Sequence, residues 1–149
     1  MPVTTDPSPQ LLEATRHNLH PRCVVCGRPG SSALGLKFQV QADGSVTASF
    51  DCHENFEGYG GMLHGGVVSA IADGAMTNCL FAHGIAAVTA ELNVRFRHPM
   101  ELGTPLTVTA RITRRAEPLF FVEAELTQAG QLKAKATGKF METPGGPRT

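Results

Sequence analysis

A single carboxylate, Asp73, stands in an otherwise apolar stretch of the chain. Residues 67–76 read VVSAIADGAM, and Ser69 is the other polar side chain among them. An unpaired carboxylate in apolar surroundings costs several kcal/mol, so Asp73 needs a polar partner or a chemical task. At helical spacing Ser69 lies one turn before Asp73 and Thr77 one turn after it, which predicts a polar stripe. Asp73 is therefore either a satisfied structural carboxylate or a general base or nucleophile.

The triplet His64-Gly65-Gly66 stands nine residues earlier, where a loop is expected to become the helix that carries Asp73. The first amides of a helix have no internal acceptor, and the helix dipole places partial positive charge there. Glycines leave such amides open to a substrate carbonyl, as an oxyanion-binding site requires. Taken alone, paired glycines before a helix are more often explained by a tight entry turn. His64 directly precedes these glycines, and this position favours a role in orienting groups at the oxyanion site.

The composition indicates one compact cytoplasmic domain. The chain has 149 residues, of which 42% are hydrophobic and 17% charged, and this suits a globular protein with a real core. Basic and acidic residues balance at 13 each, so we expect no nucleic-acid partner. The first twenty residues lack the pattern of a secretory signal, and no segment is apolar for the length of a membrane span. We therefore expect no membrane partner either.

The hydrophobic periodicity predicts an α+β fold with six strands and one long central helix. A short helix is expected at about residues 8–18 and the long, all-round apolar helix at 63–82. Period-two alternation predicts the strands, at 36–40, 46–50, 87–96, 106–112, 121–126 and 132–140. We expect an antiparallel sheet wrapped round the long helix, and a homodimer, because one sheet cannot cover that helix fully.

Three regions follow from these elements. Residues 1–33 form an N-terminal tail with the short helix and a Cys-x-x-Cys turn, residues 34–142 form the main domain, and residues 143–149 form a disordered tail.

A multi-part motif resembles the signature of PaaI-type hotdog thioesterases. It runs from Gly58 to Val67 as GYGGMLHGGV, continues to Asp73 in ADGAM, and extends through AVTAELNVRF at 87–96 and the turn at 99–103. This similarity covers roughly residues 34–141 and implies a hotdog fold that hydrolyses acyl-CoA thioesters to free acid and coenzyme A. It also implies a homodimer or a dimer of dimers, active sites built across the interface, and no cofactor.

The resemblance assigns roles to individual residues. The thioester carbonyl would bind at the Gly65 amide, and Asp73 of the other subunit would activate water or attack directly, with Thr77 holding the carboxylate or the water. A helical rise of about 1.5 Å per residue separates Asp73 from the oxyanion amides by about 12 to 14 Å, too far to serve one carbonyl within a subunit. The remaining candidates are Gly66 and His64 at the catalytic centre, Gly58, Met62 and Ser69 along the substrate, and Arg95 and Arg97 for coenzyme A phosphates.

The sequence departs from this family pattern at two positions. Many relatives carry Asn or Gln where this chain has Gly58, and one branch carries Glu where it has Gly74. Asn55 is the candidate replacement for the missing amide. Two other functions stay open: an enoyl-thioester hydratase or dehydratase of the same fold, and a non-catalytic module that binds acyl-CoA.

The four cysteines are expected to be thiols rather than a disulfide framework, because nothing marks an oxidising compartment. Cys23-Val24-Val25-Cys26-Gly27 has the spacing of a zinc half-site, for which His20, Cys52 and His53 are conceivable further ligands. A second knuckle is missing, so we favour a structural turn over a metal site.

Overall fold

The computed structural model describes residues 6–27 and 34–143. Its elements follow the predicted order, with one additional 3-10 helix before the long helix. They are α1 (Pro9–Leu19), β1 (Gln39–Val40), β2 (Val46–Phe50), η1 (Glu54–Phe56), α2 (Gly65–Ala82), β3 (Ala87–Phe96), β4 (Leu106–Ala116), β5 (Leu119–Gln128) and β6 (Gln131–Glu142).

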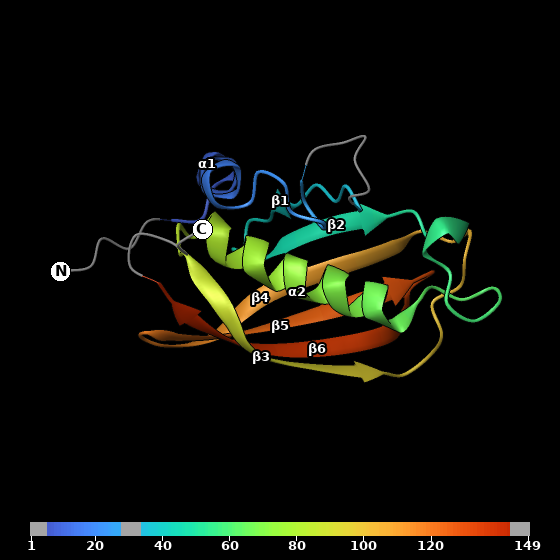
Figure 1. The fold of residues 1–149 in the computed structure, drawn as a ribbon. Coiled ribbons are helices and arrows are strands. Elements are labelled where there is room, and N and C mark those ends of the chain that lie inside the picture. The colour runs from blue at the N-terminus through green and yellow to red at the C-terminus, as the bar shows by residue number, and fades with distance from the viewer. Residues whose placement is uncertain (1–5, 28–33, 144–149) are drawn as a thin grey trace.

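The six strands form one antiparallel sheet in the order β1-β2-β4-β5-β6-β3. The sheet curves round α2, and β3 forms the edge opposite β1 (Figure 1). The predicted α+β hotdog architecture is therefore confirmed. Within the described ranges, no helix combines the length and the apolar character needed to cross a membrane.

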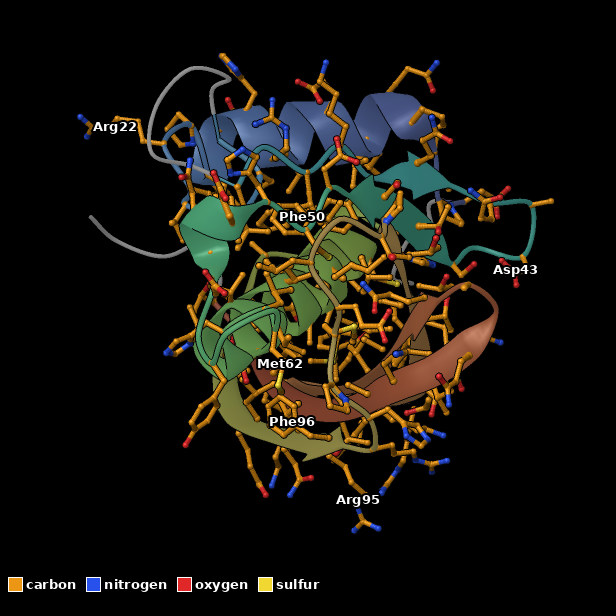
Figure 2. All side chains as sticks on the ribbon, turned by 90° about the vertical axis from the view of Figure 1, so that its right-hand side faces the viewer. Arg22, Asp43, Phe50, Met62, Arg95 and Phe96 are labelled. Carbon is orange, nitrogen blue, oxygen red and sulfur yellow. The ribbon has the colours of Figure 1, made fainter. Side chains whose placement is uncertain are left out.

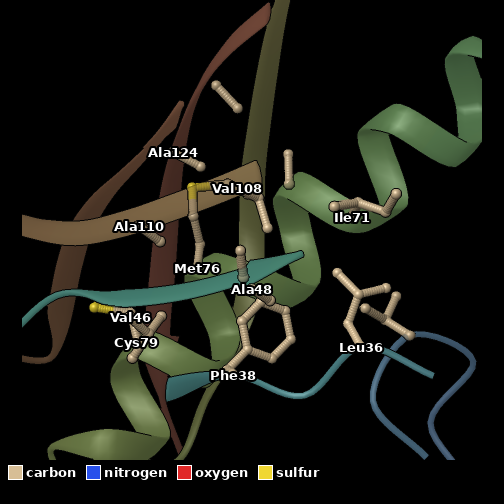
Figure 3. Packing of buried hydrophobic residues seen from close by; sticks show 14 of the residues in the cluster. Leu36, Phe38, Val46, Ala48, Ile71, Met76, Cys79, Val108, Ala110 and Ala124 are labelled. Carbon is tan, nitrogen blue, oxygen red and sulfur yellow. The ribbon is translucent and has the colours of Figure 1, made fainter. Parts of the chain in front are cut away.

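The core lies between α2 and the concave face of the sheet. Twelve of the eighteen residues of α2 are buried, which is possible because the helix is apolar on nearly every face. Met76 lies here near Val108 of β4 and Ala48 of β2, and Ile71 lies toward Leu36 (Figure 3). Burial of this helix holds the fold together and fixes where Asp73 can lie.

The ends of several elements differ from the predicted bounds. The long helix begins at Gly65 rather than residue 63, because the Leu63 amide donates to the Met100 carbonyl (2.9 Å) and His64 is the N-cap. β1 keeps two paired residues, fewer than predicted, whereas β4, β5 and β6 extend further. The Thr143 amide bonds to the Ala86 carbonyl (2.9 Å), while the rest of the predicted C-terminal tail, 144–149, lies outside the described residues.

Helix α1 packs mainly on α2 (Figure 1) and also contacts β1 at the edge of the sheet. The Cys-x-x-Cys turn follows it and also lies against α2. A Cβ atom at Gly74 would stand 2.5 Å from Cγ1 of Val25, so the absence of a side chain at residue 74 admits this turn. The departure at Gly74 from the resembled pattern therefore has a packing reason.

We predict that Gly74→Ala lowers the free energy of unfolding by about 1 to 3 kcal/mol through overpacking. The same change gains about 1 kcal/mol of intrinsic helix propensity. The sign of the measured change in unfolding free energy therefore shows which of the two effects is larger. Denaturant unfolding of Gly74→Ala, Val25→Ala and the double variant measures the coupling. The second substitution should restore most of the loss, and a Gly74→Ala protein more stable than the parent would contradict the close contact.

Candidate active site

A pocket of about 720 Å³ opens at the N-terminal end of α2. His64 and Gly65 line it from the start of the helix, Met62 from the preceding loop and Phe96 from the end of β3. Figure 2 shows Met62 and Phe96 close to each other at this end of the molecule. The pocket thus lies at the helix terminus that the sequence singled out, and it brings Gly65, His64 and Met62 together.

The two glycine amides at this terminus have different uses. Nδ1 of His64 accepts a hydrogen bond from the Gly66 amide (2.8 Å), as an N-cap does, so the Gly66 amide is occupied. Among the described residues, none accepts a hydrogen bond from the Gly65 amide. The expected oxyanion site therefore reduces to one free amide, and His64 caps the helix while its ring lines the pocket.

Asp73 lies two turns along α2 and does not line the pocket. It is half-buried, and its Oδ1 accepts a hydrogen bond from the Thr89 hydroxyl on β3 (2.7 Å). The predicted polar stripe does not form a network, because Ser69 donates to the Gly65 carbonyl (3.0 Å) and no described hydrogen bond joins Thr77 to Asp73. Asp73 thus obtains its partner from the neighbouring strand.

Thr89 is the site residue that sequence reasoning missed, and a β-bulge explains why. Thr89 pairs with Phe140, an inward-facing residue of β6, whereas beyond the bulge Val94 pairs with the inward-facing Ala136. The extra residue, Ala90, switches the face that points toward α2. Strict alternation back from Val94 would have turned Thr89 away from the helix. Residues 88–96 alternate regularly between apolar and polar types, so the sequence carried no signal for the bulge.

Gly58 and Asn55 differ in their relation to the pocket. Gly58 lines it, and a Cβ atom there would stand 3.0 Å from Cα of His64, so a larger residue would press on the helix cap. Asn55 does not reach it, because the cap that His53 provides holds Asn55 exposed in η1 (Nδ1 to amide, 3.1 Å). Within one chain Asn55 therefore lies outside the pocket, and its role as the replacement amide stays a prediction.

Arg97 and Arg95, near the end of β3, differ in their relation to the pocket. Arg97 lines the pocket, whereas Arg95 points away into solvent (Figure 2). Of these two candidate phosphate contacts, the structure places Arg97 where a ligand in the pocket would meet it.

The described residues contain one group able to hold a metal ion. His20, Cys23 and Cys26 bring their ligand atoms within 4.8 Å of one another. Cys52 and His53, the other conceivable ligands, do not join this group.

The chain was compared with known protein families and with curated relatives. The sequence model of the thioesterase superfamily matches residues 60–135. The chain belongs to this superfamily. A protein of Saccharolobus solfataricus named as a candidate esterase is 32% identical over 72% of this chain and 78% of its own. Acyl-coenzyme A thioesterase 13 of Homo sapiens is 28% identical over 67% of this chain and 69% of its own.

Solved structures of superfamily members share the fold. The PaaI protein from the phenylacetic acid degradation operon of E. coli superposes with a TM-score of 0.75, at 21% identity over 90% of this chain and 91% of that chain. A protein of Streptococcus mutans bound to acetyl CoA gives a TM-score of 0.69, at 23% identity over 76% and 91% of the two chains. The resemblance to PaaI-type proteins seen in the motif is thus confirmed.

We predict that His64→Ala destabilises the thioesterase by about 0.5 to 2 kcal/mol, because it removes the acceptor for the Gly66 amide. His64→Asn should keep most of the stability, since Asn is a preferred N-cap. His98→Ala, at an exposed pocket residue, is the matched control. Chemical denaturation measures all three, and equal stability of the His64→Ala and His98→Ala proteins would rule out a capping role.

Proposed function

We propose that this member of the thioesterase superfamily hydrolyses acyl-CoA thioesters to a free acid and coenzyme A. The observation that carries the proposal is the free Gly65 amide in the wall of the pocket. A helix-terminal N–H that no protein group occupies is suited to the oxyanion formed when a thioester carbonyl is attacked. Hydrolysis of thioesters is the activity for which the superfamily is named.

Coenzyme A is proposed as the leaving group because of the names and bound ligands of related proteins. One curated relative is named as an acyl-coenzyme A thioesterase, and one structural neighbour was solved with acetyl CoA bound. In this chain Arg97 lines the pocket and offers a guanidinium for a coenzyme A phosphate. The apolar side chains Met62 and Phe96 would then contact the acyl chain.

Asp73 supplies the base or the nucleophile in this proposal. As general base it takes a proton from water, the water oxygen bonds to the acyl carbon, the carbon–sulfur bond breaks, and the thiolate leaves. Thr89 keeps the carboxylate oriented through its hydrogen bond to Oδ1. However, the helical rise places Asp73 about 12 Å from Gly65 along α2, so the two groups of one chain cannot serve one carbonyl.

A second copy of the chain resolves this separation. β3 is a ten-residue edge strand, and its Val88, Leu92 and Phe96 are exposed, as is Met141 beside it on β6. Long exposed edges with apolar side chains are sites of strand pairing. We therefore propose a homodimer joined through β3, in which the Gly65 amide of one protomer faces Asp73 of its partner. A dimer of dimers remains compatible with this interface.

Gly65→Pro tests the oxyanion amide directly. Proline lacks the N–H but is favoured at the first position of a helix, and His64 already has an extended conformation (φ −60°, ψ 134°) that suits a residue before proline. Removing one oxyanion donor should lower kcat by about 100- to 1,000-fold. A thiol-release assay on an acyl-CoA panel measures the change.

Gly65→Ala is the control, because it keeps the N–H and its Cβ would meet Phe96 at an ordinary 3.7 Å. It should retain most activity. Equal activity of folded Gly65→Pro and Gly65→Ala proteins would sink the oxyanion assignment.

Mixed dimers test the shared site. Asp73→Asn and Gly65→Pro proteins should each be nearly inactive, whereas co-expression should restore about a quarter of the parent activity, since half of the dimers are mixed and each has one intact site. Restoration requires that the two groups come from different chains. No recovery in mixed dimers verified by mass spectrometry would place both groups of a site in one chain.

A further inference from the structure

His20, Cys23 and Cys26 form a compact cluster that the proposed active site does not use. Tetrahedral zinc, with bonds of about 2.3 Å to sulfur and about 2.0 Å to nitrogen, sets its ligand atoms about 3.5 to 3.8 Å apart. Here Sγ of Cys26 lies 3.9 Å from Nδ1 of His20, and all three ligand atoms lie within 4.8 Å of one another. A contraction of at most about 1.3 Å between any two of these atoms brings them to zinc-binding distances.

The surroundings of the cluster hold these side chains in place. The Val25 amide donates to Sγ of Cys23 (3.3 Å), an N–H to sulfur bond of the kind that stabilises a metal-bound thiolate. The His20 ring packs edge-on against Phe81 of α2, with ring centroids 4.9 Å apart and planes at 85°. Arg16 donates to the Cys26 carbonyl (3.0 Å) and fixes the turn to α1.

Asn78 of α2 supplies an independent observation. It is fully buried, its Nδ2 donates to the Gly74 carbonyl (2.8 Å), and it lies on the face of α2 where Gly74 meets Val25 and Phe81 meets His20. Its Oδ1 is the one buried side-chain oxygen or nitrogen in the described part of the chain that has no hydrogen-bond partner. Such an atom calls for an explanation, and an unfilled ion or water position beside it is one.

We propose that His20, Cys23 and Cys26 bind one Zn²⁺ ion per chain, with water as the fourth ligand and Asn78 as the polar neighbour that orients it. Two thiolates and an imidazole are a donor set that selects zinc. The ion ties His20, the C-cap of α1, to the Cys-x-x-Cys turn and thereby stabilises the packing of this segment on α2. This site is separate from the proposed catalytic groups, and its test does not depend on thioesterase activity.

The test uses the full chain without an affinity tag, prepared under reducing conditions. Mass-spectrometric metal analysis should find about one zinc per chain, and Co²⁺ substitution should give thiolate-to-metal charge-transfer and tetrahedral d–d absorption bands. Cys23→Ser, Cys26→Ser and His20→Ala should lose both signals. Chelation should lower the melting temperature of the parent protein, and added zinc should restore it.

Matched controls separate ligands from bystanders. His17→Ala removes an exposed histidine of the same helix, and Cys79→Ala removes a buried thiol outside the cluster, so both should keep the zinc. Asn78→Ala should weaken zinc binding by about 10- to 100-fold, as removal of a neighbour of the ligands does. The proposal is overturned if the parent chain binds zinc no better than the Cys23→Ser/Cys26→Ser protein, or if the two thiols form a disulfide in place of a metal site.

Discussion

The structure depends on burying a helix that is apolar on nearly all sides. The curved sheet covers one side of α2, and α1 with the Cys-x-x-Cys turn covers a second. The side toward β3 is covered least, and there the strand exposes Leu92 (39%) and Phe96 (55%). Asp73 lies on this side, where a carboxylate keeps access to water and to Thr89. Because this side of α2 is only partly buried, it is where the helix can carry the Asp73 carboxylate.

The two halves of the candidate site come from different properties of the same helix. Gly65 contributes a backbone amide that any helix leaves free at its start, whereas Asp73 contributes a side chain from the middle. One rigid helix holds the Gly65 amide and Asp73 about 12 Å apart along its axis, so these two groups of one chain cannot move closer together. In the proposed dimer, the surface that hides the exposed apolar side chains of β3 would also bring the two groups together. Assembly and activity would then be linked through one interface.

The sequence predicted most of the fold because its periodicity is strong. All-round apolar character identified α2, and alternation identified the sheet strands that pack on it. Three features needed the structure. The bulge at Ala90 reverses the alternation and brings Thr89 to Asp73, which no fixed period predicts. The His64 side chain takes the Gly66 amide, a choice set by ring orientation rather than by residue type. The placement of the Cys-x-x-Cys turn on α2 depends on the close approach of the distant Val25 to Gly74.

That contact makes two features of the chain mutually exclusive. The volume beside Asp73 that a side chain at residue 74 would occupy is filled by Val25, which belongs to a segment almost fifty residues earlier. A glutamate at residue 74, directly after the aspartate, as in one branch of the resembled family, is incompatible with this packing of the turn. Residue 74 and the N-terminal turn are thus expected to change together during divergence, and the identity of residue 74 becomes a marker for which members of the superfamily can carry the turn in this position.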